Sequence, residues 1–264
     1  MAIKIAINGA AGKMGRRVLA LASADKELEV AQILERPGHP WLGRCACEFE
    51  PECNAAARLA DRLMAGADVV IDFSSPEGTI VRLHEAVALR MPLVIGTTGI
   101  SEDQIAEIKR AAQQVPVIHA PNFSLGVNLI FRLAAEMARA LGENFDIEIV
   151  EAHHNKKADA PSGTALGIAK AVCEALGRDP RRSLVHGRHG KPGARSREEI
   201  GMHALRLGSV VGDHTLCFAS EFERIELTHR AQTRDVFAAG ALRAAKWLAG
   251  KKPNLYTMAD VLFG

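Results

Sequence analysis

A short polar run, Glu151 to Thr164, carries side-chain types suited to acid–base chemistry and anion binding. It contains two adjacent histidines, His153 and His154, and a lysine, Lys157, four residues after the first. Imidazole and ammonium groups can bind a carboxylate or phosphate, and they can donate a proton to a reacting atom. An ordinary solvated charged loop is the alternative, and the residue types alone leave both interpretations open.

The segments on either side of this run predict where it lies. Residues 145–151 alternate apolar and acidic side chains, as a strand does, and residues 164–176 are typical of a helix. Ser162 follows Pro161 at the position where a helix N-cap belongs. The run therefore joins a strand to a helix N-terminus, whose free N–H groups and dipole favour an anion.

Length and composition favour a globular protein. The 264 residues suffice for one large domain or two smaller ones, and 48% apolar and 24% charged residues are ordinary values. A net charge of +2 gives little reason to expect a nucleic-acid or anionic-membrane partner. We see no apolar run of membrane-spanning length and no signal peptide before the first strand, so we expect a cytoplasmic protein.

Three of the five cysteines, Cys45, Cys47 and Cys53, fall in an irregular segment over residues 39–54. A Cys-x-Cys pair with a third cysteine can bind metal, but no fourth ligand has an accepted zinc spacing. We therefore expect a variable loop with reduced thiols and no metal site.

The N-terminal segment has the pattern of a dinucleotide-binding fold. An apolar strand over residues 1–7 leads into the turn Gly9, Gly12 and Gly15, and residues 16–22 continue as a helix. Gly9 would permit the tight turn, Gly12 the approach of a pyrophosphate, and Gly15 the close packing of helix on strand. A glycine triplet can also be an ordinary turn, but here a strand and a helix flank it.

The end of the next strand, residues 29–34, supports this interpretation. Glu35 lies 20 residues after Gly15, where an acidic residue would bind the adenine ribose hydroxyls. Arg36 could instead meet a 2′-phosphate, so the pair suggests tolerance of both NADH and NADPH. A surface ion pair at a strand end is the alternative.

Further apolar strands at residues 67–73, 92–95 and 115–119 alternate with helical segments, which predicts a doubly wound parallel sheet. Ligands bind such sheets at the carboxyl ends of the strands, where Phe73 and the turn at residues 96–99 lie.

Several helix boundaries follow from capping residues. Ser75 before Pro76 and Ser101 with Gln104 predict helix starts, and helical sequence is expected to resume at Ala55.

The second half of the chain predicts a long helix followed by a mixed sheet. The helix spans residues 125–141, and strands at 201–207, 212–219 and 222–229 join the one at 145–152. Helices on one face would leave the other face uncovered, so we expect an oligomer built through these sheets.

Composition and position predict a loop and a helix for two further segments of this half. Residues 178–197 are expected to be a long charged loop, which lacks aromatic residues to stack bases and so does not indicate nucleic-acid binding. Residues 233–248 would be a final helix returning to the nucleotide-binding half. Arg234 at its start could reach a substrate carboxylate, and an exposed charge is the alternative.

Taken together, these segments resemble the 4-hydroxy-tetrahydrodipicolinate reductase family, also called dihydrodipicolinate reductase, of bacterial lysine and diaminopimelate synthesis. The segments that carry the resemblance are Gly9-Ala-Ala-Gly-Lys-Met-Gly15, Ile71-Asp-Phe73, Val94-Ile-Gly-Thr-Thr-Gly99, Asn122-Phe-Ser124, Glu151-Ala-His-His154 and Asp159-Ala-Pro-Ser-Gly-Thr-Ala165. The resemblance covers nearly the whole chain.

The fold implied by the resemblance is α/β, with a Rossmann-like doubly wound parallel sheet and a second α+β domain with a mixed open sheet. The dinucleotide-binding domain would comprise residues 1–124 and 234–264. The substrate-binding and oligomerisation domain would comprise residues 125–233 and would assemble a homotetramer.

The resemblance also implies roles for individual residues. His153 and Lys157 match the family's proton-donating residues. The residues expected to bind substrate, from the resemblance and from the helix starts together, are His154, Ser162, Gly163, Thr164 and Arg234. The residues expected to bind the cofactor are Gly9, Ala10, Ala11, Gly12, Lys13, Met14, Glu35, Arg36, Phe73, Gly96, Thr97, Thr98, Ala120, Pro121, Asn122 and Phe123.

The sequence departs from the family pattern at two places. Ser75 stands where members often carry arginine, which removes one contact to a phosphate or ribose. The loop at residues 41–57 matches no family pattern.

The implied reaction is the NADH- or NADPH-dependent reduction of a cyclic imine that carries two carboxylates. One alternative is another two-domain dehydrogenase, which would act on an aldehyde or a hydroxy acid. The other is a dinucleotide-sensing protein without turnover. A substrate screen that follows NADH oxidation distinguishes the three.

Overall fold

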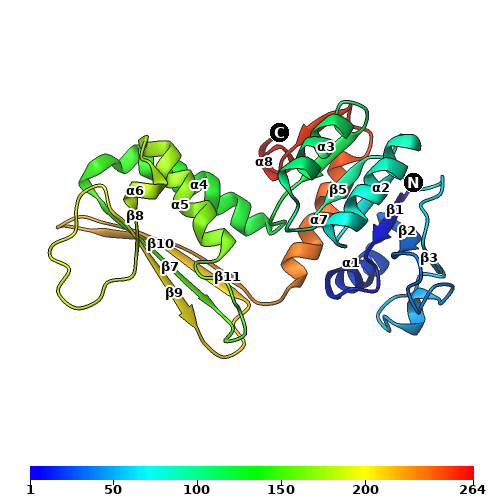
Figure 1. The fold of residues 1–264 in the computed structure, drawn as a ribbon, viewed down its shortest axis with the longest axis horizontal. Coiled ribbons are helices and arrows are strands. Elements are labelled where there is room, and N and C mark those ends of the chain that lie inside the picture. The colour runs from blue at the N-terminus through cyan, green and yellow to red at the C-terminus, as the bar shows by residue number, and fades with distance from the viewer. The chain divides into compact units, whose positions relative to one another are not determined.

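The computed structural model describes all 264 residues, which form two compact units. Unit 1 comprises Met1–Leu125 and Arg234–Gly264, and unit 2 comprises Gly126–Thr233 (Figure 1). Each unit has its own hydrophobic core. None of the helices combines the length and the apolar character that crossing a membrane requires.

Unit 1 is built on a parallel sheet in the order β12-β6-β5-β4-β1-β2-β3. Its strands are β1 (Ile3–Asn8), β2 (Leu28–Leu34), β3 (Leu59–Ala60), β4 (Val69–Asp72), β5 (Leu93–Ile95), β6 (Pro116–His119) and β12 (Asn254–Tyr256). The apolar central strands are buried because helices cover both faces. One core holds α1 (Lys13–Ala24) and α7 (Asp235–Leu248), and the other holds α2 (Pro76–Ala88) and α3 (Glu102–Ala111). The predicted doubly wound parallel sheet is confirmed.

Capping residues start two of these helices where the sequence predicts. The Ser75 side chain accepts a hydrogen bond from the Gly78 N–H, with proline at the first helical position of α2. Ser101 and Gln104 form the predicted capping box at the start of α3.

Two expectations for unit 1 are wrong. No helix begins at Ala55, because the chain there pairs as extended backbone: Ala46 N–H donates to Ala57 O, and β3 joins the edge of β2. Tertiary pairing overrides the helix propensity of the alanines. The helix α7 is also not the last element, since β12 and α8 (Met258–Phe263) follow it and β12 extends the sheet beside β6.

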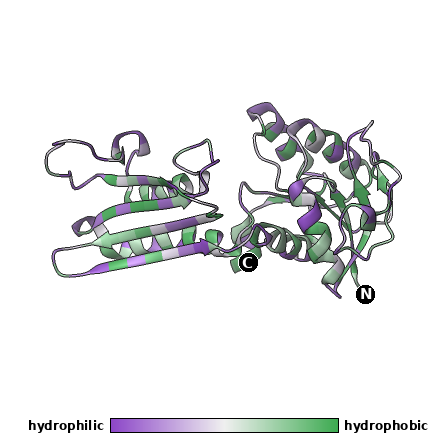
Figure 2. Ribbon diagram, turned by 90° about the horizontal axis from the view of Figure 1, so that it is seen from below, coloured by the Kyte–Doolittle hydropathy of each residue, from purple (hydrophilic) through white to green (hydrophobic).

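Unit 2 is a mixed sheet in the order β11-β10-β7-β9-β8. Its strands are β7 (Asp146–His153), β8 (Leu184–His186), β9 (Ile200–Arg206), β10 (Gly212–Ala219) and β11 (Arg224–Ala231), and its helices are α4 (Leu125–Leu141), α5 (Gly163–Leu176) and α6 (Pro180–Ser183). Buried and part-exposed residues alternate along β7 and β10, and the buried ones share a core with α4 and α5. Figure 2 shows hydrophobic and hydrophilic residues interspersed along the strands of this sheet.

The long loop predicted over residues 178–197 is shorter than expected. Its first part forms α6, which Asp179 caps, and then β8, which pairs in parallel with β9. The sheet consequently has one strand more than the four that the sequence suggests.

Candidate active site

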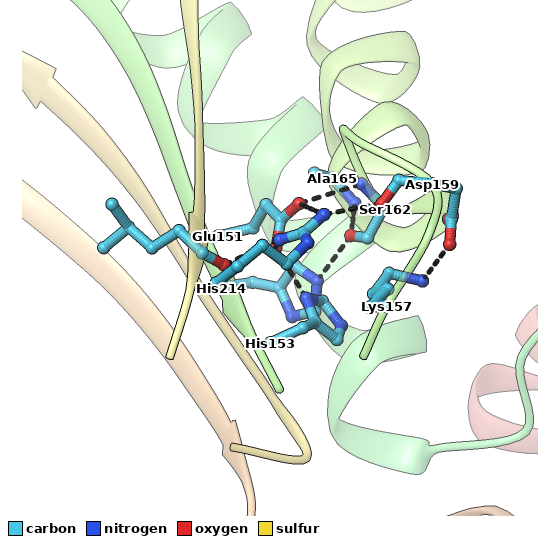
Figure 3. Close-up of polar contacts among 9 residues, drawn as sticks. Glu151, His153, Lys157, Asp159, Ser162, Ala165 and His214 are labelled. Atoms are coloured by element: carbon cyan, nitrogen blue, oxygen red, sulfur yellow. Dashed lines mark hydrogen bonds and ion pairs between the residues drawn. The ribbon is translucent and has the colours of Figure 1, made fainter. Parts of the chain in front are cut away.

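Glu151 is the centre of the polar cluster in unit 2. It occupies an inward-facing position of β7 and is 1% exposed. Its carboxylate lies 2.5 Å from His153 Nδ1, accepts the Ser162 N–H at 3.1 Å, and accepts both terminal nitrogens of Arg206 at 2.9 Å (Figure 3). Burial alone would raise the pKa of Glu151, but the bonds from Arg206 and His153 hold the pKa below its ordinary value. A buried anion thus organises three cationic or donor groups.

The contact with Glu151 fixes the orientation of the His153 ring. A carboxylate can only accept, so Nδ1 carries the proton in this bond and Nε2 is the nitrogen available to a substrate. A side chain at Gly212 would place its Cβ 3.0 Å from this Nε2, and glycine there leaves that nitrogen clear.

Ser162 is the N-cap of α5, as the sequence predicts. Its Oγ accepts the Ala165 N–H at 3.1 Å and lies 2.9 Å from His214 Nε2, while its own N–H is bonded to Glu151. With both polar groups engaged and the residue 2% exposed, Ser162 orients the first turn of α5, where Gly163 and Thr164 lie.

His214, on β10, was not singled out from the sequence. Burial, followed by repulsion from His153, lowers its pKa from 6.5 to about 4, so the ring is neutral at neutral pH. Its Nε2 then accepts the Ser162 hydroxyl, and its ring lies edge-on to that of His153 with centroids 5.2 Å apart. The only sequence feature that could have indicated this role is the inward-facing position of His214 in a strand of alternating residues.

Arg206 was also missed. It lies opposite His153 in the parallel pairing of β7 with β9 and also donates to Asp159 O at 2.6 Å. It thereby ties the loop that follows β7 to the Glu151 carboxylate.

Lys157 lies in that loop, with its Nζ 2.8 Å from Asp159 Oδ1. This bond lowers the pKa of Asp159, and the Lys157 N–H donates to His154 O at 3.1 Å. The structure therefore places Lys157, His153 and the start of α5 in one cluster (Figure 3). His154 is half-buried and lies next to His153 in the chain. Arg234 belongs to unit 1, where it is exposed at the N-cap position of α7.

The neutral state of His214 predicts a pH dependence of stability. Between about pH 4 and 6.5 the unfolded chain binds a proton at this histidine that the native protein does not. The free energy of unfolding should therefore fall as the pH falls through this window, by up to about 3 kcal/mol from His214. His119 and His229, whose pKa values burial also lowers, act in the same direction.

A His214→Gln variant isolates this contribution, because the amide oxygen can still accept the Ser162 hydroxyl but does not titrate. Urea unfolding across the window should show a shallower pH dependence than in the wild type. An unchanged slope would mean that His214 titrates alike in both states.

Unit 1 contains a pocket of about 470 Å³ between the glycine turn, the end of β2 and the start of α2. The predicted cofactor-binding residues that line it are Gly9, Gly12, Glu35, Arg36 and Phe73. Ala10 and Ala11 complete the glycine turn, and Lys13 and Met14 begin α1.

The geometry of the turn requires its glycines. Gly9 has φ +75°, and a Cβ there would lie 2.5 Å from Phe73 O. A Cβ at Gly15 would lie 2.0 Å from Gly9 O, so the predicted close packing of helix on strand is present. Gly12 is the N-cap of α1 without a side-chain cap, which leaves N–H groups of the first turn for an anion. This cradle fits a dinucleotide pyrophosphate.

Asp72 is a buried residue at the same edge of the sheet, and no sequence pattern above assigns it a role. Its fully buried carboxylate accepts hydrogen bonds from Asn8 Nδ2 at 2.6 Å, Ser74 Oγ at 2.6 Å, Thr79 Oγ1 at 2.5 Å and Thr97 Oγ1 at 2.8 Å. It therefore holds the ends of β1, β4 and β5 in fixed positions. The sequence feature that could have indicated this role is the position of Asp72, an acidic residue at the end of an otherwise apolar strand.

The remaining predicted cofactor residues follow β5 and β6 at the same edge. Gly96 admits the Phe73 ring, since a Cβ there would lie 2.2 Å from a ring carbon, and Phe73 packs edge-on to the buried Phe123. The residues that share this edge with them are Thr97, Thr98, Ala120, Pro121 and Asn122.

Comparison with known families gives a match over nearly the whole chain. Residues 3–123 match the family described as dihydrodipicolinate reductase, N-terminus, and residues 126–262 match dihydrodipicolinate reductase, C-terminus. Similar curated proteins include the 4-hydroxy-tetrahydrodipicolinate reductases of Syntrophotalea carbinolica, 47% identical over 98% of both chains, and Alkalilimnicola ehrlichii, 46% identical over 99% of both.

One solved structure supports the same relationship, and a second shares only the fold. A dipicolinate-bound dihydrodipicolinate reductase from Paenisporosarcina sp. is similar with a TM-score of 0.76 and 25% identity, covering 98% of this chain and 99% of that one. The NAD complex of GenD2, from gentamicin A biosynthesis, has a TM-score of 0.59 at 13% identity, covering 99% of this chain and 90% of that one, and shares the fold.

Proposed function

The chain belongs to the dihydrodipicolinate reductase family, and we propose that it reduces a dihydrodipicolinate-type cyclic imine to tetrahydrodipicolinate with NADH or NADPH. This step serves diaminopimelate and lysine biosynthesis. The observation that supports it best is the Glu151 cluster, because it gathers an imidazole, an ammonium group and a helix N-terminus for a small anionic ring.

The proposed chemistry needs a proton donor beside the ring nitrogen. When bound, a reduced nicotinamide would supply the hydride for a ring carbon conjugated with the C=N bond, and negative charge would then build on the nitrogen side of the substrate. Lys157 Nζ, or Nε2 of His153 in its imidazolium form, donates the proton that neutralises this charge, a contribution of about 10²–10⁴-fold. Glu151 keeps the His153 ring oriented for this transfer through the bond to Nδ1.

The two substrate carboxylates need fixed donors. The N–H groups of Gly163 and Thr164, in the first turn of α5, can hold one carboxylate, with His154 contributing from the position just after β7. Ser162 fixes these N–H groups in advance through its bonds to Glu151 and His214, so little reorganisation accompanies binding.

An assay with enzymatically supplied substrate tests the proposal. The condensation product of pyruvate and aspartate semialdehyde is generated in the cuvette, and nicotinamide absorbance is followed with each cofactor. The proposal predicts oxidation that depends on this substrate. Tight NADH binding without oxidation would contradict it, as would activity only on aldehydes or hydroxy acids.

Glu35 is expected to bind the adenine ribose, because it lines the glycine-turn pocket at the end of β2. Glu35→Ala should weaken NADH more than NADPH, since Arg36 remains to meet a 2′-phosphate. Fluorescence titration with both cofactors measures this ratio. Glu29→Ala, an exposed change on the same strand, is the matched control, and an equal effect of both changes would refute the ribose role.

We also propose that the protein assembles into a homotetramer through unit 2. We propose further that it is located in the cytoplasm, where the biosynthetic cofactor pool is found. The supporting observation is the sheet face opposite α4 and α5, where half-exposed Val150, His203 and Thr215 lie side by side on adjacent strands. Light scattering of the purified protein measures the assembly directly, and a monomer at micromolar concentration would contradict it.

A further inference from the structure

Three cysteines lie between β2 and β3 in a segment that the cofactor pocket does not use. All are free thiols, but their surroundings differ. The Cys53 sulfur is buried and lies 3.1 Å from Ser23 Oγ and 3.3 Å from the Ala55 nitrogen. The sulfurs of Cys45 and Cys47 lie 3.0 Å from each other, and Cys47 is exposed.

We propose that Cys45 and Cys47 form a redox-active dithiol, which closes to an intramolecular disulfide by exchange with a low-molecular-weight disulfide such as oxidised glutathione. This property is independent of the proposed reductase reaction, because neither thiol lines the dinucleotide pocket or belongs to the Glu151 cluster.

Local structure holds the two sulfurs together. A 3₁₀ turn over Ala46–Glu48 begins at Cys45, whose backbone oxygen accepts the Glu48 N–H at 3.0 Å while its own N–H donates to Glu48 Oε1 at 2.8 Å. An antiparallel bridge between Cys45 and Arg58 anchors the turn. The sulfurs need to approach by only about 1 Å to reach the bond length of a disulfide, about 2.0 Å.

The two thiols are chemically unequal, which suits an exchange reaction. The Cys47 S–H donates to the Cys45 sulfur, and this bond, helped by the charge of Arg58, lowers the pKa of Cys45. The same bond raises the pKa of Cys47. Cys45 is therefore the better thiolate nucleophile, and Cys47 is the thiol that resolves the mixed disulfide.

The thiol–disulfide exchange takes place in two steps. The Cys45 thiolate attacks one sulfur of the small disulfide, forms a mixed disulfide and releases one small thiolate. Cys47 then loses its proton and attacks the Cys45 sulfur, which forms the internal disulfide and releases the second small thiolate. Overall the protein dithiol is oxidised by two electrons, and one small disulfide is reduced to two thiols.

The test compares the full-length protein with the free peptide Arg-Cys-Ala-Cys-Glu, which has the sequence of residues 44–48. Both are equilibrated in buffers of reduced and oxidised glutathione, alkylated and analysed by peptide mass spectrometry. Because the fold already holds the sulfurs together, the equilibrium constant for the internal disulfide should be at least about tenfold larger in the protein. A smaller ratio, or a disulfide that includes Cys53, would overturn the proposal.

Two variants sharpen the comparison. Cys47→Ser should stop at a mixed disulfide between Cys45 and glutathione, because the resolving thiol is gone. Cys217→Ser, a change of a part-exposed thiol on β10, should leave the equilibrium of the Cys45–Cys47 pair unchanged. Complete loss of Cys45 modification in Cys47→Ser would show that Cys45 is not the nucleophile and would overturn the assignment.

Discussion

Lys157→Ala is expected to lower turnover by about 10²-fold or more while leaving cofactor affinity unchanged. The side chain lies in the loop between β7 and α5, 2.8 Å from Asp159, beside the helix N-terminus proposed to hold a substrate carboxylate. Removing it would take away the proposed proton donor and its positive charge, which are expected to act when charge builds on the ring, so kcat should fall more than KM rises. Steady-state kinetics and a separate NADH titration measure the two effects.

Lys156→Ala is the matched control for this variant. Lys156 is the exposed neighbour of Lys157 in the same loop, and its removal changes the net charge equally. Its turnover should stay close to that of the wild type. Near wild-type turnover in Lys157→Ala would remove Lys157 from the mechanism, and an equal loss in both variants would point to a general effect of charge.

Glu151→Gln is expected to lower turnover by about 10²-fold and to destabilise unit 2. The carboxylate accepts hydrogen bonds from His153 and Arg206, and the amide NH₂ of glutamine cannot accept them. The His153 ring therefore loses its fixed orientation, and Arg206 loses its buried counter-charge. Leaving such a group without its partner costs about 1–3 kcal/mol. In the serine proteases, changing the carboxylate that orients the catalytic imidazole to its amide lowers kcat by about 10⁴-fold, so a loss of about 10²-fold is a modest expectation.

Glu148→Gln is a close control, because Glu148 lies on the same strand and also binds arginine and histidine. Its carboxylate contacts Arg188 and His203, and these bonds hold its pKa low against the raising effect of burial. It faces away from the Glu151 side of the sheet, so its removal should cost stability but change turnover by less than about threefold. Equal losses of turnover in the two variants, after correction for unfolded protein, would contradict a specific role for Glu151.

Local signals in the sequence predicted the elements that frame both sites. The caps Ser75, Ser101 and Ser162 act within three residues of their own position, so their pattern is readable in the chain. The glycine turn is also local, because Gly9 and Gly15, which approach each other closely, are only six residues apart in the chain. These features place the start of α1 and the start of α5 correctly.

Long-range pairing could not be predicted in the same way. Arg206 and His214 reach the Glu151 cluster only through the register of β9 and β10 against β7, which a single sequence does not reveal. The helix predicted from Ala55 is wrong for a related reason, because backbone pairing with residues 43–46 outweighs the helix propensity of this segment. Asp72 belongs to the same class, because two of its partners, Asn8 and Thr97, are 64 and 25 residues away along the chain.

The most direct test of the account is a crystal structure of this protein with dipicolinate and NADH bound. Dipicolinate is a planar ring with two carboxylates, and a similar reductase has been solved with it bound. We expect one carboxylate on the N–H groups of Gly163 and Thr164, with Lys157 Nζ or His153 Nε2 within about 3.2 Å of a polar atom of the ring system. Dipicolinate bound with both of these nitrogens well away from it would contradict the proposed mechanism.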